Sequence, residues 1–308
     1  MTEQPRKLAY NDPFAETEET KAAQYVASGK LLDAVEVALA LGMPLLLTGE
    51  PGTGKTQLAH YLARTLHFDR PDRFPSSKLE VFHTKSTSVH TDLFYQYEAL
   101  LHFRESRGEG AAPKPTSDYI RLEPLGLAIR QARDRGHRTV VLIDEVDKAP
   151  RDFPNDILNE IEEMKFKVKE TGEEYVAHDQ SLKPVLVFTS NQERDLPDAF
   201  RRRCVFFHIK FEDLDKARII QSRLGLEPSS HQEIVTAAFN RFNEIREMKT
   251  KLEKLPAMAE LINWMRYLVL KGIDVSKPES QSLLAVSYSL LAKSDADLKA
   301  LKSESPRK

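Results

Sequence analysis

Five short apolar runs stand out along the chain, each bounded by polar or turn-forming residues. They lie at 45–48, 79–82, 140–143, 185–189 and 205–209. Apolar runs of this length without strict alternation are typical of strands buried on both faces, as in a parallel sheet. Segments with the three- and four-residue spacing of amphipathic helices separate the runs. The pattern therefore predicts an α/β fold in which helices cover both faces of a five-stranded parallel sheet.

The same pattern divides the chain into four parts. Residues 1–20 carry prolines and glutamates without apolar periodicity, which predicts a flexible N-terminal arm. Residues 21–211 contain all five runs and form the predicted αβα core. Residues 212–293 show helical spacing and no strand pattern, so we expect a small helical domain, or lid. Residues 294–308 are polar and are predicted to be a frayed tail.

Two segments interrupt the alternation of strands and helices in the core. Residues 104–119 contain two glycines and two prolines, which predicts an exposed inserted loop. Residues 165–176 alternate around Thr171-Gly172, which predicts a β-hairpin.

Composition narrows the classes of function. The 45 basic and 47 acidic residues give a formal net charge of −2, so nucleic acid is not a favoured partner. The most apolar stretch, 34–47, is interrupted by polar and turn residues and is shorter than the roughly 18 residues of a membrane span, so we expect no membrane association. A single cysteine, Cys204, and a start without a secretory pattern favour the cytoplasm. No histidine has zinc-ligand spacing.

The segment after the first run carries the strongest chemical signal. It reads GEPGTGKT and fits GxxxxGK[ST], with a strand pattern before it and a helical pattern after it. Glycines let the backbone wrap around phosphate oxygens, while the amide groups at the start of the following helix attract the anion. Lys55 is expected to reach the β and γ phosphates of ATP, and the Thr56 hydroxyl to help hold Mg²⁺. The alternative is a plain glycine turn between core elements. The candidate nucleotide-binding residues are Gly49, Glu50, Pro51, Gly52, Thr53, Gly54, Lys55, Thr56, Gln57 and Asp144.

A second signal is the third run, which ends in the adjacent carboxylates Asp144 and Glu145. Side chains at the ends of parallel strands emerge at the edge where open α/β sheets bind ligands. Asp144 is suited to holding Mg²⁺ together with Thr56, and Glu145 is suited to accepting a proton from an attacking water. The alternative is an acidic helix start that is stabilised by the helix dipole.

Polar residues also follow the fourth run and precede the fifth. Asn191 is suited to orienting a water beside the γ-phosphate, although asparagine is also common as a cap. Arg201, Arg202 and Arg203 stand just before Cys204 and the fifth run. Arginine suits the charge that develops on a transferred phosphate, but such a run by itself is more typical of a solvated basic corner. Cys204 is interpreted as a small buried residue at the start of a strand.

Together, GEPGTGKT, VVLIDE, the TSN strand end and LPDAFRRRC resemble the AAA+ ATPases, and within them the MoxR-like branch close to the McrB and dynein-related group. The resemblance covers residues 20–290. It implies strand order 5-1-4-3-2, a helical lid, and a ring, most often a hexamer, with ATP sites between subunits. It also implies that Asn191 is the sensor 1 residue and that Arg203, or else Arg202, acts as an arginine finger on the neighbouring subunit.

The assignment to a branch within the family rests on weaker features. Residues 92–126 resemble the helix-2 insertion of the MoxR-like branch, and 165–176 resemble the hairpin before sensor 1; in such rings these elements face the pore or the partner. Family members usually carry a sensor 2 arginine where a lid helix begins, but residues 254–261 contain none. Arg266 lies farther along the same predicted helix as a possible substitute, although an ordinary exposed helix arginine is the favoured interpretation.

Three functions are compatible with these features. The leading hypothesis is an ATP-driven chaperone-like ATPase that remodels a protein partner, as MoxR relatives do with von Willebrand factor A domain proteins. The second is a DNA-directed motor or loader, and the third is a nucleotide-gated assembly switch with little hydrolysis. The absence of a sensor 2 arginine at the expected position is the reason to retain the assembly switch as an alternative.

Overall fold

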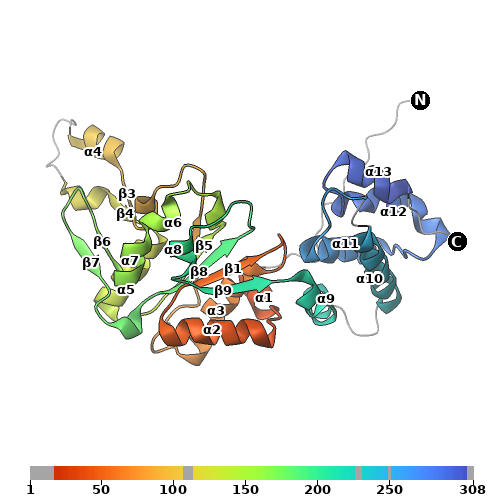
Figure 1. Ribbon diagram of the computed structural model, residues 1–308, viewed down its shortest axis with the longest axis horizontal. Coiled ribbons are helices and arrows are strands. Elements are labelled where there is room, and N and C mark those ends of the chain that lie inside the picture. The colour runs from red at the N-terminus through yellow and green to blue at the C-terminus, as the bar shows by residue number, and fades with distance from the viewer. Residues whose placement is uncertain (1–16, 107–113, 226–230, 249–250, 304–308) are drawn as a thin grey trace. The chain divides into compact units, whose positions relative to one another are not determined.

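The computed structural model describes residues 17–106, 114–225, 231–248 and 251–303. The chain divides into two compact units, Tyr25–Asp215 and a second unit of Lys216–Lys308 with the first 24 residues (Figure 1). The division lies at Asp215, four residues beyond the boundary expected after residue 211.

The five apolar runs form one parallel sheet in the first unit. Its strands, in spatial order β9-β1-β8-β5-β2, pair in parallel throughout. Numbered by their own sequence order, the five strands follow the order 5-1-4-3-2, which confirms the expectation. The strands are β1 (Leu45–Gly49), β2 (Glu80–His83), β5 (Val140–Asp144), β8 (Val185–Ser190) and β9 (Val205–Ile209).

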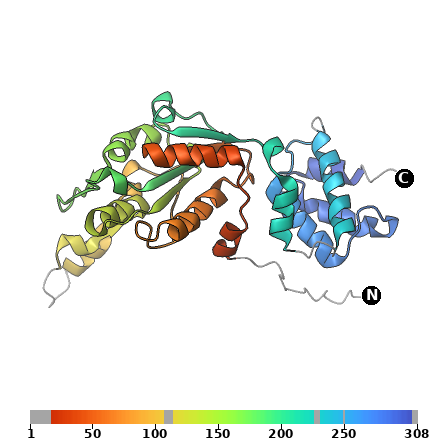
Figure 2. The same cartoon turned by 90° about the horizontal axis from the view of Figure 1, so that it is seen from below.

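Both faces of this sheet are buried, as the uninterrupted apolar runs predict. Leu45, Leu46 and Leu47 of β1 are each at most 2% exposed, and they alternate between two hydrophobic cores. One core contains residues of α2 (Gly29–Leu41) and α3 (Lys55–Asp69). Figure 2 shows α2 lying along β9. The other core contains residues of α5 (Pro124–Arg135), α6 (Phe153–Asp156), α7 (Leu158–Glu163) and α8 (Asp198–Arg201).

The described part of the insertion between β2 and α5 contains more secondary structure than the sequence suggested. Strands β3 (Tyr95–Tyr97) and β4 (Ile120–Leu122) pair antiparallel, and α4 (Ala99–Ser106) lies between them in the chain. The expected loop at 104–119 is therefore wrong at both ends, while 107–113 lie outside the described residues. The reason is local packing: the ring of Tyr119 stacks 4.3 Å from that of His102, and the Tyr119 hydroxyl donates to Glu105.

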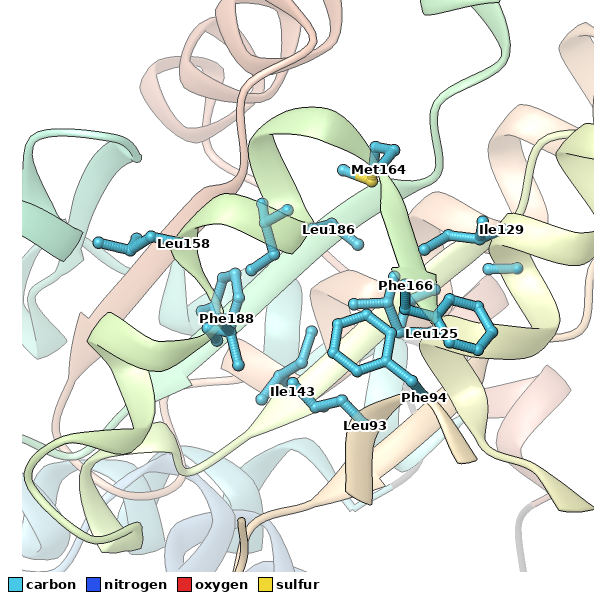
Figure 3. Packing of buried hydrophobic residues seen from close by; sticks show 14 of the residues in the cluster. Leu93, Phe94, Leu125, Ile129, Ile143, Leu158, Met164, Phe166, Leu186 and Phe188 are labelled. Carbon is cyan, nitrogen blue, oxygen red and sulfur yellow. The ribbon is translucent and has the colours of Figure 1, made fainter. Parts of the chain in front are cut away.

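The predicted hairpin is present. Strands β6 (Lys165–Lys167) and β7 (Glu174–Val176) pair antiparallel around Gly172, whose φ of 75° is readily accessible to glycine. The ring of Phe166 stacks on Tyr175 and on Phe94, with centroids 4.8 and 5.2 Å apart. Figure 3 shows Phe94 and Phe166 side by side near Leu125 of α5. The hairpin is thus tied to the β3–β4 ribbon by aromatic contacts.

The described part of the second unit is helical. Its helices are α1 (Glu18–Ala23), α9 (Lys216–Leu224), α10 (Gln232–Glu247), α11 (Met258–Lys271), α12 (Gln281–Ser287) and α13 (Asp295–Ser303). Trp264 and Tyr288 are almost fully buried at its centre, where the indole N–H of Trp264 donates to Ser287 Oγ at 2.8 Å. Among the described helices of the chain, none is long and apolar enough to span a membrane.

Two predictions at the chain ends need correction. Residues 294–308 are not simply a frayed tail, since α13 buries Leu301 and Asp297 to 1% exposure each. The polar composition hid a short amphipathic helix, which is secured because Asp297 Oδ1 accepts the backbone N–H of Glu253 at 2.7 Å. At the other end, α1 begins at Glu18 within the expected arm and is capped by Thr17.

Short 3₁₀ helices complete the described structure. They are η1 (His90–Leu93), η2 (Thr116–Tyr119), η3 (Val146–Lys148), η4 (Gln180–Leu182), η5 (Phe211–Asp213), η6 (Pro278–Ser280) and η7 (Tyr288–Leu290).

We expect Gly126→Ala to destabilise the first unit. A Cβ at Gly126 would lie 1.9 Å from the Phe94 carbonyl oxygen, so α5 and the backbone at Phe94, just before β3, would have to move apart. Overpacking of this kind costs about 2–3 kcal/mol, against the roughly 1 kcal/mol by which alanine favours a helix. Far-UV circular dichroism during denaturant unfolding measures the loss, while Trp264, the only tryptophan, reports on the second unit by fluorescence.

The matched control is Gly29→Ala, which also lies in a helix but has no atom within 4 Å of the added Cβ. It should leave the unfolding curve unchanged or shift it slightly upward. Equal curves for the two variants would show that α5 and the Phe94 backbone are not in close contact.

Candidate nucleotide site

The loop from β1 to α3 depends on glycine at three positions. Gly49, Gly52 and Gly54 have φ values of 149°, 78° and 90°, a region that side chains disfavour. A Cβ at Gly49 would also lie 2.5 Å from the Ile209 carbonyl oxygen. Gly54 precedes α3 directly, and no side chain caps that helix. The loop therefore presents backbone N–H groups at a helix start, where an anion binds well.

Lys55 places a buried cation in this loop. Its Nζ donates to the carbonyl oxygens of Gly49 and Glu50 at 2.8 and 3.0 Å, and the residue is 6% exposed. Burial lowers the pKa of Lys55 from 10.5 to about 8, although nearby carboxylates, led by Asp147, oppose the shift. A bound phosphate group would place further negative charge beside this buried ammonium group and stabilise its charged form.

The remaining loop residues are arranged around this lysine. Thr53 Oγ1 donates to the Glu50 carbonyl at 2.8 Å and stabilises the turn. Glu50, Pro51 and Gly52 are exposed. Gln57, in the first turn of α3, has a buried Oε1 without a hydrogen-bond partner among the described residues.

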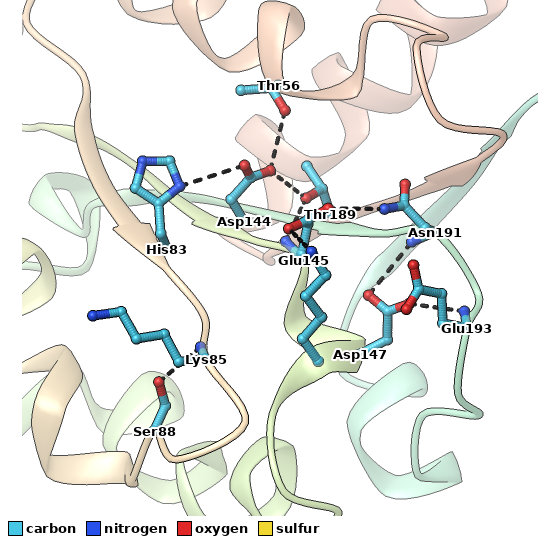
Figure 4. Close-up of polar contacts among 11 residues, drawn as sticks. Thr56, His83, Lys85, Ser88, Asp144, Glu145, Asp147, Thr189, Asn191 and Glu193 are labelled. Atoms are coloured by element: carbon cyan, nitrogen blue, oxygen red, sulfur yellow. Dashed lines mark hydrogen bonds and ion pairs between the residues drawn. The ribbon is translucent and has the colours of Figure 1, made fainter. Parts of the chain in front are cut away.

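The predicted metal ligands are in direct contact. Thr56 Oγ1 donates to Asp144 Oδ1 at 3.1 Å, which joins the start of α3 to the end of β5 (Figure 4). A hydroxyl and a carboxylate are hard oxygen donors that fit Mg²⁺, an ion usually held by one or two carboxylates with waters and phosphate oxygens. On the other side, His83 Nδ1 lies 3.6 Å from Asp144 Oδ2.

Thr189 links the two carboxylates and was missed by sequence reasoning. Its Oγ1 donates to Asp144 Oδ1 at 2.6 Å and accepts the backbone N–H of Glu145 at 2.8 Å. Thr189 is 1% exposed, near the end of β8 between β5 and β1. The predicted strand order, with β8 central, was the signal that could have found it.

Glu145 is held by two further side chains. Asn191 Nδ2 donates to Glu145 Oε1 at 3.0 Å, so the structure brings the predicted sensor residue to the predicted base. Lys148 Nζ donates to Oε2 at 2.5 Å, a contact that the sequence reading did not include. Glu145 itself has a φ of 55°, which is uncommon for a residue with a side chain. The carboxylate is therefore oriented by its backbone and by donors on both oxygens.

Arg202 and Arg203 lie away from this cluster. They precede β9, which runs parallel to β1, so they lie near the amino ends of the strands while the loop and carboxylates lie at the carboxyl ends. Arg203 forms an ion pair with Glu162 and donates to the Ala199 carbonyl at 3.2 Å. Both arginines line a surface cavity of about 260 Å³ together with Lys183.

Two other residues named from the sequence have structural roles. Cys204 is buried, and burial raises the pKa of its thiol to about 12, so it is unreactive at neutral pH. Arg266 lies on α11, where its guanidinium donates to the Arg223 carbonyl at 2.8 Å and thereby links α11 to α9.

Comparisons with known proteins agree with this geometry at the level of the family. The family profile of the AAA domain (dynein-related subfamily) matches residues 44–204. No curated protein matches the chain. A crystal structure of a candidate ATPase from Cytophaga hutchinsonii aligns with 89% of this chain and 84% of its own, at 14% identity and a TM-score of 0.39. A TM-score this low gives no information about activity.

We expect Lys55→Met to stabilise the nucleotide-free protein and to eliminate its response to Mg-ATP. An apolar side chain relieves the cost of burying the ammonium group, which should raise the free energy of unfolding by about 1–2 kcal/mol at pH 7. The same change removes the ammonium group that would bind the phosphates, so Mg-ATP should no longer raise the melting temperature. Differential scanning fluorimetry measures both effects, with exposed Lys30→Met as the control.

The pH dependence of this difference follows from the direction of the shift. The pKa of Lys55 in the folded protein, about 8, lies below the usual 10.5, so the folded state releases this proton first as the pH rises. Its cost is fully present below pH 8 and is relieved toward pH 10.5. The advantage of Lys55→Met should therefore shrink over that window, and a variant less stable than wild type at pH 7 would contradict the prediction.

Proposed function

The chain belongs to the AAA domain proteins of the dynein-related subfamily, and from this premise we propose that it hydrolyses ATP to ADP and phosphate with Mg²⁺. One observation carries the proposal. A continuous set of hydrogen bonds runs from Thr56 through Asp144 and Thr189 to Glu145 and Asn191, beside Lys55. This set connects the glycine loop, the Thr56–Asp144 pair and the Glu145 carboxylate at one edge of the sheet, which supports the roles proposed for them.

Each residue of this set has a distinct part in the proposed reaction. Lys55 and the loop N–H groups bind the β and γ phosphates, and Thr56 with Asp144 holds the Mg²⁺ ion. When bound, Mg²⁺ would offset the negative charge of the phosphates. Glu145 accepts a proton from water while the water oxygen bonds to the γ-phosphorus and the bond from that phosphorus to the ADP oxygen breaks. Asn191 orients Glu145 and the water.

We further propose that the active form is a homo-oligomeric ring, most simply a hexamer, in which Arg203 completes the site of the neighbouring subunit. The location of Arg203 supports this, because its own chain's carboxylates lie at the opposite edge of the sheet. An arginine that contacts the γ-phosphate from the next subunit stabilises the transition state and makes hydrolysis depend on assembly. Arg202, one residue earlier, is the second candidate.

The proposed task of the ring is to remodel a protein partner, in the manner of MoxR-type ATPases and with a von Willebrand factor A domain protein as the favoured client. Near-zero net charge supports a protein client over DNA. The two are separated by measuring whether a purified client of that class, or duplex DNA at several salt concentrations, stimulates phosphate release. Stimulation by DNA alone would replace this assignment with a DNA-directed motor.

Glu145→Gln should abolish hydrolysis and retain binding. The carboxamide has a similar shape but accepts no proton, so the rate of phosphate release should fall by about 10²-fold or more. The dissociation constant for a fluorescent ATP analogue should change little, because Glu145 does not hold the phosphates. Exposed Glu36→Gln is the control. A wild type that forms rings yet releases no phosphate would instead indicate an assembly switch.

Mixing subunits tests the position of the arginine. Arg203→Ala should lose about 10²-fold or more in hydrolysis with little change in nucleotide affinity. When it is mixed with Glu145→Gln, some interfaces combine an intact base from one subunit with an intact arginine from the other, so activity should exceed the sum of the two variants alone. Exposed Arg130→Ala is the control, and mixed rings without recovery would direct the same experiment to Arg202.

A further inference from the structure

A third carboxylate, Asp147, lies beside the proposed base and has no part in the reaction described above. It belongs to the 3₁₀ turn η3, two residues after Glu145, and is 3% exposed. Burying a carboxylate is costly unless hydrogen bonds stabilise it. The identity of its donors therefore indicates what the residue does.

The donors are backbone N–H groups of the loop that follows β8. Asp147 Oδ1 accepts the N–H of Asn191 at 3.4 Å, and Oδ2 accepts the N–H of Glu193 at 2.9 Å. The intervening N–H, that of Gln192, donates to Ser190 Oγ at 3.0 Å, and Gln192 has a φ of 60°. Successive N–H groups around a left-handed residue form a concavity that binds anions. Here the Asp147 carboxylate is that anion (Figure 4).

The Asp147 carboxylate and the N–H groups of Asn191 and Glu193 together form what we call the cradle. The cradle fixes the loop from which the Asn191 side chain reaches Glu145. A left-handed conformation at a residue such as Gln192 costs roughly 1–2 kcal/mol, and surrounding contacts must compensate for it. Two of the three loop amides are held by Asp147, and the side chain of the same Asn191 donates to Glu145 at 3.0 Å. The same short segment therefore carries Glu145, the proposed base, and Asp147, which positions Asn191 against it.

We propose that Asp147 is a positioning residue for hydrolysis, which fixes the 191–193 loop so that Asn191 is held against Glu145. The inference rests on the proposed ATPase function for its kinetic consequence, but the cradle itself does not depend on activity. A competing role is purely electrostatic, because Asp147 is the leading carboxylate that opposes the lowered pKa of Lys55. The two roles differ in effect: loss of position reduces kcat, whereas loss of charge beside Lys55 changes nucleotide affinity.

The kinetic experiment is a double-mutant cycle with Asp147→Ala, Asn191→Ala and the double variant. Each single change should lower kcat by about 10- to 100-fold, the range expected when a reacting group is displaced by about 1 Å. The dissociation constant for a fluorescent ATP analogue should stay within about threefold. If Asp147 acts through Asn191, the double variant should be no worse than the poorer single variant. Multiplied losses, or weaker binding with unchanged kcat, would overturn the proposal.

Hydrogen–deuterium exchange tests the cradle without any need for turnover. The amides of residues 191–193 should exchange faster in Asp147→Ala than in wild type, and also in Asp147→Asn, which retains one acceptor oxygen and is the milder change for folding. Asp152→Ala is the control, since this exposed aspartate makes no side-chain cap bond to α6. Unchanged exchange in both Asp147 variants would overturn the inference even if the protein hydrolyses ATP. If the amides exchange faster in the variants but the wild type shows no turnover, the structural role of Asp147 stands and the ATPase proposal is contradicted.

Discussion

Parallel pairing of β1 with β8 and of β8 with β5 determines where the candidate nucleotide site lies. In a parallel sheet the carboxyl ends of neighbouring strands meet at one edge, and here Leu47 is in register with Thr189, and Ile143 with Phe188. The residues that follow these strand ends are polar, so a phosphate-binding loop and two carboxylates are brought together. Because the strands are buried on both faces, a shift of register would expose apolar residues. The close packing of the core therefore also holds the site residues in place.

The site concentrates charge that is only partly balanced in the protein alone. Lys55 is buried, and its pKa is lowered even though Asp147, Asp144 and Glu145 all act in the opposite direction. Each carboxylate is in turn held by hydroxyl, amide or ammonium donors. An arrangement of this kind favours a ligand that carries both signs, such as a polyphosphate with a divalent cation, because it supplies negative charge to the lysine and positive charge to the carboxylates.

Sequence reasoning succeeded where a pattern is local and was incomplete where contacts join distant segments: it placed Asp144 with Thr56 and Asn191 with Glu145 but missed other members of the site. Each predicted strand matches an observed one to within one residue, and GEPGTGKT identified the loop, because apolar runs and glycine spacing act over a few residues. Thr189 and Asp147 were missed because their roles arise from bonds between residues 44 to 46 positions apart. The helix α13 was missed for a different reason: two leucines in a polar stretch, Leu298 and Leu301, are a weak signal unless a partner surface is known.

The separation of Arg203 from its own chain's carboxylates constrains how copies can associate. If the arginine of one subunit completes the site of the next, the surface that gives it and the surface that receives it are different patches, so the contact is heterologous. A two-fold symmetric dimer satisfies such a contact on both sides only if the two patches lie within one self-complementary interface, and their positions at opposite edges of the sheet disfavour this. Repeating it must either close into a cyclic assembly or extend as a helical filament, and in both cases neighbouring ATP sites point in the same direction around or along the assembly.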